Sequence, residues 1–410
     1  MQSTNVYALL TPIVLVFILL EIVVCRVFRK NYISFSESVA NFGTQIGNQT
    51  VNVLMAVGVY VSYGWLYDNF RIFTIELNWF TFILLFLGID FIFYWVHRWG
   101  HKINIFWAAH SPHHSAEEMN FIVSLRTGIT QRLLYFMFFW VMTIVGFHPV
   151  DIYLIVGIHV AVGFIYHTEF VGKLWRPIEF IFTTPSHHRV HHGVNLRYLD
   201  KNYGEFLIIW DRIFGTFEEE NEKPAYGMLD HPRTTNPILI NFHFYIVLWR
   251  YAVAAPFWWD KIRIWFMPSG WIPRGLERKE KPNITVENQI KFRPEMFPNG
   301  KIYLTLQVLL GIAWMLGVIS NVYDWSTGEK WIGAAILWWQ IVNWSGILES
   351  KPWLVYSETL RNLVALFAVI VFNQLYQPNI LLVGIITIAL FSIVWTNLYF
   401  RQLPQKLVLA

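Results

Sequence analysis

Long apolar runs alternate with short polar connections along most of this chain. A helix needs about 20 apolar residues to cross the hydrocarbon core of a bilayer, and most of these runs approach that length. They cover residues 7–25, 50–67, 79–96, 133–147 and 150–166, and then 302–319, 331–348, 361–376 and 379–399. The pattern predicts an all-α fold, a multi-pass transmembrane helical bundle of about nine spans.

A mixed region, residues 167–300, separates the two sets of runs and is crossed by no continuous apolar run. Its last part, residues 268–300, is rich in proline, glycine and charged residues, which is typical of a linker. We therefore predict a first membrane domain over residues 1–267, a linker over residues 268–300 and a four-span membrane domain over residues 301–410.

Basic residues indicate the orientation of the predicted spans, because Lys and Arg are enriched on the cytoplasmic side of membrane proteins. Arg26, Arg29 and Lys30 follow the first run and place the next connection inside. Threading the remaining spans from there also places segments 97–132 and 167–301 inside. The connections on the opposite side are short and poor in Lys and Arg, which supports the span count.

Composition agrees with a membrane protein and narrows the chemistry. Only 14% of the 410 residues are charged, whereas soluble domains contain about 25%. The formal net charge is +4 and no long basic run is present, so we expect no nucleic-acid partner. The single cysteine, Cys25, excludes a disulfide within the chain and an iron–sulfur cluster bound by the chain's own cysteines.

Nine of the fourteen histidines fall into three short groups, which span residues 97–101, 110–114 and 187–192. Side chains three or four residues apart lie on one face of a helix, so each group can direct imidazoles towards a metal ion. The predicted topology brings all three groups to the cytoplasmic face. Eight imidazoles in this spacing exceed the coordination of one metal, so we predict two.

The isolated histidines are expected to be structural. His148 lies at a predicted outside turn, and His231 and His243 stand alone, so we interpret these three as satisfied surface or interfacial side chains. For His159, in the middle of a predicted span, we favour the same structural interpretation over a polar role in the bundle.

The three histidine groups, followed by the segments Asp200–Gly204 and Trp210–Phe217, resemble the fatty acid hydroxylase and sterol desaturase superfamily. Within it, the run Thr184–Gly193 and the segment His167–Glu169 are most similar to alkylglycerol monooxygenases, also called glyceryl-ether monooxygenases. The resemblance covers residues 79–268 strongly. It implies a membrane oxygenase that uses a histidine-bound di-iron centre and O2 to oxidise a lipid, which makes the first membrane domain the catalytic one.

The resemblance also implies the metal ligands and the substrate class. The implied ligands are His97, His101, His110, His113, His114, His188, His191 and His192, with His167 as the extra ligand between the second and third groups. The favoured substrate is the ether-linked alkyl carbon of an alkylglycerol. One departure from the subgroup is Lys102, since animal alkylglycerol monooxygenases carry an acidic residue just after the first group.

An external electron donor is required as well, because no G-x-G-x-x-G run in a strand–turn–helix context is present to bind a nucleotide or flavin. The resemblance implies a tetrahydropterin for alkylglycerol monooxygenases and a b-type cytochrome for most of the superfamily. Both donors remain open.

Three further side chains are candidates for orienting the metal-bound histidines. Asp90 lies seven residues before His97, about two helical turns away on the same side. A buried carboxylate there could hold an imidazole in place, and a hydrogen bond within the bundle is the alternative. Glu169 allows the same two interpretations, of which we favour the structural one, and His187 is the third candidate.

Other functions remain as alternatives. A sterol desaturase or methyl oxidase and a fatty acyl hydroxylase would use the same superfamily site. A membrane zinc hydrolase is disfavoured because H-E-x-x-H is absent and one zinc would leave most imidazoles unused. A metal transporter is disfavoured because its ligands are expected near the bilayer midplane. We expect a multi-pass integral membrane protein, in the inner membrane of a bacterium or the endoplasmic reticulum of a eukaryote.

Overall fold

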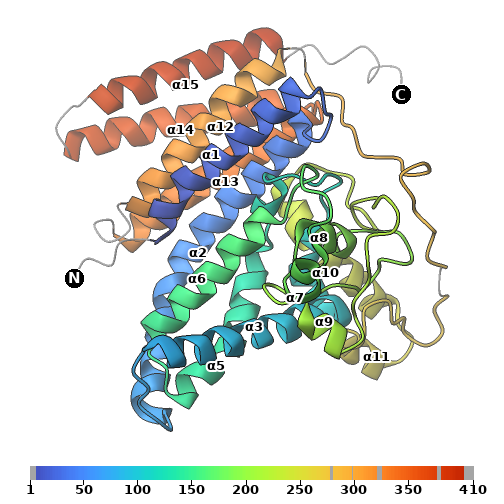
Figure 1. Cartoon of the computed structure of the whole chain (residues 1–410). Coiled ribbons are helices and arrows are strands. Elements are labelled where there is room, and N and C mark those ends of the chain that lie inside the picture. Colours follow the sequence, from blue (N-terminus) through green and yellow to red (C-terminus); the bar gives the residue numbers. More distant parts are fainter. Residues whose placement is uncertain (1–5, 278–279, 298, 321–325, 376–379, 401–410) are drawn as a thin grey trace.

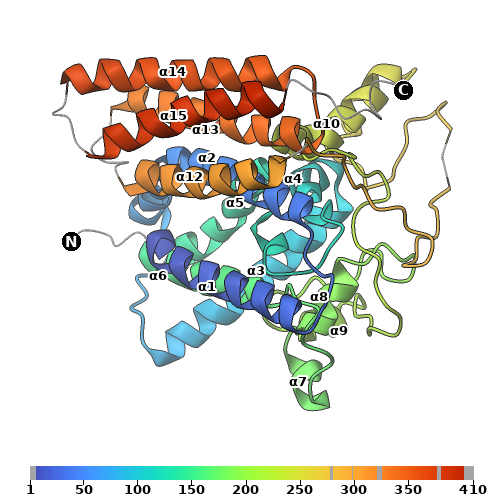
Figure 2. The same ribbon diagram turned by 90° about the horizontal axis from the view of Figure 1, so that it is seen from above.

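The computed structural model describes residues 6–277, 280–297, 299–320, 326–375 and 380–400. Helices form the regular structure of these residues, and only isolated β-bridges join them elsewhere. Figures 1 and 2 show long helices side by side in a bundle, with short helices and loops gathered at one end, away from the start of the first helix. The predicted all-α architecture is confirmed.

Long helices account for all nine of the apolar runs, except that residues 376 and 379 at the ends of two runs lie outside the described residues. They are α1 (Val6–Val27), α2 (Phe35–Phe70), α3 (Trp79–Lys102), α5 (Ile129–Val145), α6 (Pro149–Ile165), α12 (Gly300–Ser320), α13 (Thr327–Leu348), α14 (Leu354–Leu375) and α15 (Ile380–Tyr399). Judged by length and composition, three helices in the described part of the chain can cross a membrane: α3, α10 (Pro237–Ala254) and residues 300–317 of α12. The count of about nine spans therefore stays a prediction.

The helix α10 corrects the interpretation of residues 167–300 as a region that no apolar run crosses. Asn241, His243 and Arg250 interrupt its apolar sequence and hide it from a search for continuous runs. The helix is nevertheless well defined at its start, where the Asn236 side chain accepts hydrogen bonds from the N–H groups of Ile238 and Leu239.

Two hydrophobic clusters hold the long helices together. One lies among α2, α3, α5 and α6 and includes Tyr63, Ile89 and Phe139. The other lies among α2, α12, α13 and α14, where Ile46 packs in the same cluster as Trp344. Because α2 is 36 residues long, or about 54 Å, it contributes to both clusters and joins the two halves of the chain. The division at residues 268–300 stays a prediction.

Short helices carry the polar end of the bundle. They are α4 (Asn104–His114), α7 (Arg176–Ile181), α8 (Pro185–His191), α9 (Ile209–Ile213) and α11 (Trp258–Arg263). The helix α4 follows α3 after one extended residue, Ile103, and packs against α3, α5 and α10. The second histidine group is thereby brought beside the first.

Candidate metal centre

Nine buried histidines form two compact groups at this end of the bundle. The five-histidine group contains His97, His101, His110, His114 and His191, and the four-histidine group contains His113, His167, His188 and His192. Within each group, one ring nitrogen from every imidazole lies within 4.8 Å of those of the others. The structure therefore brings together all nine side chains that the resemblance implied as ligands and sorts them into two sets.

Helix geometry explains how sequence neighbours reach different groups. Successive residues of an α-helix are rotated by about 100°, so His113 and His114 on α4 point to different groups. His191, at the end of α8, and His192, its C-cap residue, are divided in the same way. His97 and His101 lie one turn apart on α3 and meet in the five-histidine group.

Backbone carbonyl groups fix the tautomers of four of these imidazoles. The Nδ1 atom of His97 lies 2.9 Å from the carbonyl oxygen of Tyr203. The Nδ1 atoms of His113, His167 and His191 each lie 3.0 Å from a carbonyl oxygen, those of Arg126, Gly163 and Lys201 respectively. A carbonyl oxygen can only accept, so each Nδ1 carries the hydrogen and each Nε2 presents a lone pair to the interior of its group.

These lone pairs face one another in a way that suits a cation. The Nε2 atoms of His113 and His167 are 3.3 Å apart, and neither has a hydrogen to share. Two lone pairs at this distance repel, and a bound metal ion would convert the repulsion into two coordinate bonds. The donor set therefore fits a transition metal such as iron, which accepts neutral imidazole.

Burial keeps the imidazoles in the form that binds metal. It lowers the pKa of His110, His114, His167, His188, His191 and His192 well below 6.5. The pKa of His113 falls to about 4 for the same reason. A protonated imidazole has no lone pair for a metal, so this environment favours coordination at neutral pH.

Asp90 lies against the loop that follows the third histidine group. Its carboxylate accepts hydrogen bonds from the N–H groups of Phe206, at 2.9 Å, and Leu207, at 3.2 Å, and from Nε1 of Trp210, at 2.9 Å. It also faces Nε2 of His159 at 3.4 Å. The group that holds His97 is thus the carbonyl of Tyr203, and Asp90 fixes the segment a few residues further along.

Asp211 also fixes the position of the Tyr203 carbonyl group. Its carboxylate accepts hydrogen bonds from the N–H groups of Tyr203, at 2.8 Å, and Gly204, at 2.7 Å, and from the hydroxyl of Thr216, at 2.6 Å. The preceding turn contains two residues with positive φ, Asp200 at 64° and Asn202 at 56°, a conformation that Asp and Asn tolerate better than most residues. This turn directs the carbonyls of Lys201 and Tyr203 towards His191 and His97.

The other candidate side chains lie around the two groups. His187 belongs to neither group; its Nε2 is 3.6 Å from a carboxylate oxygen of Glu179 and its Nδ1 is 3.3 Å from the hydroxyl of Thr184. Glu169 accepts a hydrogen bond of 2.7 Å from the hydroxyl of Tyr226. Lys102 forms an ion pair with Asp200 at 2.7 Å, so the residue that departs from the subgroup contacts the turn beside the five-histidine group.

The isolated histidines make contacts of a structural kind. His148 is the N-cap of α6, where Nδ1 accepts a hydrogen bond from Val150 N–H. The ring nitrogens of His231 and His243 lie 2.9 Å and 3.0 Å from the carbonyl oxygens of Ser115 and Asp230.

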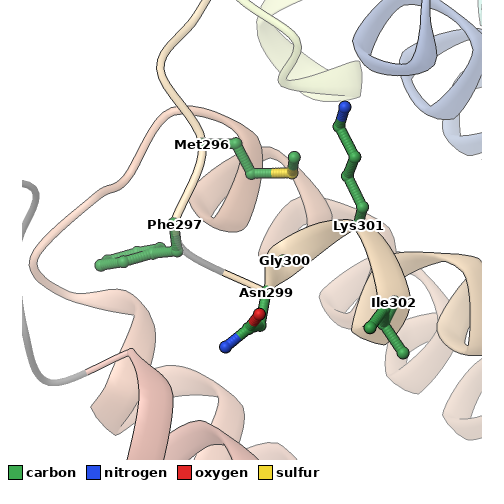
Figure 3. Close-up of a pocket in the computed structure, with 6 residues that line it drawn as sticks. All are labelled: Met296, Phe297, Asn299, Gly300, Lys301 and Ile302. Carbon is green, nitrogen blue, oxygen red and sulfur yellow. The ribbon is translucent and has the colours of Figure 1, made fainter.

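A surface hollow of about 360 Å³ lies at the start of α12 and holds no part of the metal centre. It is lined by Met296, Phe297, Asn299, Gly300, Lys301 and Ile302, as Figure 3 shows. Phe297 belongs to the hydrophobic cluster around Trp344, and no histidine lines the hollow. We assign it no chemistry.

Comparison with known proteins places the centre in a family. The fatty acid hydroxylase family model matches residues 82–216, which contain every histidine of the two groups. Alkylglycerol monooxygenase of Homo sapiens is 32% identical over 367 residues, covering 87% of this chain and 80% of that protein. The chain belongs to the alkylglycerol monooxygenase family.

Further relatives support this membership. Alkylglycerol monooxygenase of Danio rerio is 34% identical over 73% of this chain and 68% of its own length. Ornithine lipid hydroxylase OlsE of Rhizobium tropici is 32% identical over 31% of this chain and 39% of its own length. No solved structure matches the chain.

Family membership establishes the reaction class. This chain is an oxygen-dependent lipid monooxygenase of the fatty acid hydroxylase type, a family that depends on iron. The resemblance noted from the sequence is confirmed, and the zinc hydrolase and metal transporter alternatives fall away. Both histidine groups are suited to hold metal.

Proposed function

We propose that this enzyme hydroxylates the ether-linked alkyl carbon of an alkylglycerol lipid, using O2 and two iron ions. One observation carries the proposal: the similarity to alkylglycerol monooxygenases extends over 87% of the chain, far beyond the histidine groups that every member of the superfamily needs. Hydroxylation at this carbon gives a hemiacetal, which collapses unaided to a fatty aldehyde and a free glycerol hydroxyl.

The five-histidine and four-histidine groups would each hold one iron ion. When bound, iron with O2 supplies an oxidant strong enough for an unactivated C–H bond. The chain's own contribution is to keep the nine imidazoles neutral by burial and aimed inward by carbonyl groups. One oxygen atom of O2 enters the lipid and the other leaves as water, so each turnover needs two electrons and two protons from outside.

A tetrahydropterin is the proposed electron donor, on the strength of the family membership. A b-type cytochrome is the second candidate, because most of the superfamily uses one. Sterol desaturase or methyl oxidase activity and fatty acyl hydroxylation remain the alternative reactions, and either one would favour the cytochrome.

The proposed placement has nine spans, with the metal centre at the cytoplasmic face. In a eukaryote this is the endoplasmic reticulum membrane, and in a bacterium the inner membrane. A lipid could then reach the centre from the bilayer with its reactive carbon near the head group. Residues 1–267 would form the catalytic membrane domain and residues 301–410 a second membrane domain joined by the linker 268–300.

The proposal is tested with membranes that contain the protein, an alkylglycerol, tetrahydropterin and O2. We expect fatty aldehyde to form, and none to form without O2 or without the pterin. If aldehyde is absent while a sterol or acyl lipid is hydroxylated with a b-type cytochrome as donor, the proposed substrate is wrong.

Anaerobic purification followed by metal analysis should give two iron ions per chain. Zinc in aerobically purified material would not contradict iron, because zinc binds such sites more tightly.

A further inference from the structure

The side chain of Glu205 is held in a defined place beside the metal centre. Its backbone is fixed on both sides, because Gly204 N–H donates to Asp211 at 2.7 Å and Phe206 N–H donates to Asp90 at 2.9 Å. Two residues before it, the carbonyl of Tyr203 accepts from His97 of the five-histidine group. Glu205 is therefore part of a rigid loop and not of a free surface segment.

The carboxylate itself lies against the element that holds the four-histidine group. Oε1 of Glu205 occupies the space where a side chain at Gly163 of α6 would begin, so any larger residue there would clash with it. The carbonyl of the same Gly163 accepts from Nδ1 of His167 at 3.0 Å. The Glu205 carboxylate thus contacts Gly163, the residue whose carbonyl group positions the His167 imidazole.

Tyr135 on α5 approaches the centre from another side. Its hydroxyl fills the space beside Gly100, the residue immediately before His101, and would clash with a side chain there. Its ring centroid is 6.0 Å from that of His110. The hydroxyl is buried and has no hydrogen-bond partner.

Tyr166 is the third oxygen-bearing side chain beside the metal centre. It is buried, directly precedes His167, and its ring centroid is 6.0 Å from that of His188. The charge of Glu205 acts on the hydroxyls of both tyrosines. Three oxygen-bearing side chains from three segments of the chain therefore converge beside the two histidine groups.

The Tyr135 hydroxyl lacks the partner that a buried polar atom normally has. The Glu205 carboxylate interacts with the charges of His159 and Asp90, but no hydrogen bond from a described residue reaches it. Burial raises the pKa of Glu205 to about 7. Leaving the buried Tyr135 hydroxyl unpaired is unfavourable, whereas a ligand that supplies hydroxyl groups could form hydrogen bonds with it and with the other two side chains.

The surroundings indicate what kind of ligand this is. One helical turn beyond Tyr135, Phe139 belongs to the apolar cluster among α2, α3, α5 and α6, and its ring centroid is 4.8 Å from that of Phe93. A ligand here would meet polar groups at one end and hydrocarbon or aromatic groups at the other. In an alkylglycerol, one ether oxygen separates the reactive carbon from the glycerol backbone, so groups that bind its hydroxyls must lie next to the metal centre.

We propose that Glu205, Tyr135 and Tyr166 bind the hydroxyl groups of the substrate's glycerol head group and thereby set the position of the alkyl carbon that reacts. This inference rests on the proposed alkylglycerol substrate. Glu205 accepts hydrogen bonds from the lipid hydroxyls, and the tyrosine hydroxyls donate to or accept from them. A lipid with methylated hydroxyls cannot donate to Glu205, although its ether oxygens can still accept from the tyrosine hydroxyls.

The test compares Glu205→Gln, Tyr135→Phe and Tyr166→Phe with Glu219→Gln, a matched control at the exposed ion pair with Lys173. The first readout is binding of an alkylglycerol to the metal-free protein, followed by its intrinsic tryptophan fluorescence. The second readout is the KM for the alkylglycerol, measured in membranes. Binding is measured for two lipids, one alkylglycerol and the same lipid with both hydroxyls methylated. A hydrogen bond to a charged group contributes more than one between neutral groups. We therefore expect at least about tenfold weaker alkylglycerol binding for Glu205→Gln and about threefold for each tyrosine variant.

The methylated lipid separates head-group binding from other roles of these residues. We expect Glu205→Gln and the wild type to bind it equally, with kcat for the alkylglycerol changed much less than KM. Equal weakening for both lipids, or a loss of kcat with KM unchanged, would overturn the inference and make Glu205 a proton-transfer or structural residue. If the wild type oxidises alkylglycerol and the three variants bind it with the same affinity and KM as the wild type, the inference is overturned as well, while the proposed function stands. If the wild type neither binds nor oxidises alkylglycerols, both the head-group inference and the proposed function are overturned. If Glu205→Gln does not fold, the two tyrosine variants decide the outcome.

Discussion

The Nε2 atoms of His113 and His167 lie 3.3 Å apart, although neither can donate a hydrogen to the other. Both rings already donate through Nδ1, to the carbonyls of Arg126 and Gly163. Without a cation this contact is repulsive, and with one it becomes part of a coordination sphere. A bound metal would therefore contribute to the stability of the fold as well as to the reaction.

Removing the metal should lower thermal stability. A ligand present at about 1,000 times its Kd stabilises the folded state by about 4 kcal/mol, so the metal-free protein should unfold at a clearly lower temperature. The measurement is Tm of anaerobically purified protein before and after chelation, with readdition of ferrous iron as the control. An unchanged Tm would mean that the imidazole groups are stable without a cation.

Replacing a single histidine of either group should weaken binding of the metal ion in that group. In His113→Ala the four-histidine group keeps three ligands, and in His191→Ala the five-histidine group keeps four. We expect each variant to insert into the membrane, to lose up to one iron per chain and to lose monooxygenase activity. His243→Ala is the control, because this side chain contacts the carbonyl and the carboxylate of Asp230 and lies outside both groups. Full activity in either ligand variant would remove that residue from the proposed site.

Asp211→Ala should weaken the five-histidine group without touching an imidazole. The variant loses three hydrogen bonds that hold the Tyr203–Gly204 segment and Thr216, so the carbonyl on His97 is no longer fixed. Groups that orient metal ligands typically change metal affinity or activity by about 10- to 100-fold when removed. Iron affinity and activity should fall together, whereas Thr216→Ala, which removes one of the three bonds, should have a smaller effect. Wild-type iron affinity in Asp211→Ala would contradict this positioning role.

A buried ion pair within α14 accepts hydrogen bonds from side chains of α12 and α13. Glu358 lies 2.9 Å from Nε of Arg361, and it also accepts hydrogen bonds from the hydroxyl of Tyr303 and from Asn343. Arg361→Ala leaves a buried carboxylate unpaired, which should destabilise the protein by about 3–5 kcal/mol. Tyr303→Phe should cost about 1–2 kcal/mol.

The control for this pair is the double variant Glu358→Leu/Arg361→Met, which removes both charges. Replacing a buried ion pair by apolar side chains is often neutral or stabilising, so the double variant should unfold at a higher temperature than Arg361→Ala. Equal destabilisation of the two variants would show that packing, and not the unpaired charge, accounts for the loss.

The proposed topology can be tested by labelling single cysteines. Cys25 is buried and can first be replaced by Ser. A cysteine at Glu219, whose side chain is 56% exposed, should then react with a membrane-impermeant reagent only from the cytoplasmic side. A cysteine at Asp68, exposed at the end of α2, should react only from the opposite side. The reverse pattern would invert the proposed orientation.

The sequence determined the helices, the family and the identity of the nine clustered histidines. Apolar runs and spacings of three to five residues are local properties, and a helix turns them directly into faces. Apolar runs did not reveal α10, because Asn241, His243 and Arg250 break its apolar sequence, although the helix packs against α4, α2 and α13.

Only the tertiary structure decided how the histidines are shared between two groups and what holds them. His113 and His114 are adjacent in the chain but face different groups, and His167 joins the four-histidine group from the end of another helix. The fixed Nδ1 atoms are bound by backbone carbonyls, which every residue possesses and no motif reveals. The partners of Asp90 and the convergence of Glu205 with Tyr135 and Tyr166 likewise depend on contacts between segments far apart in the chain, which local periodicity does not encode.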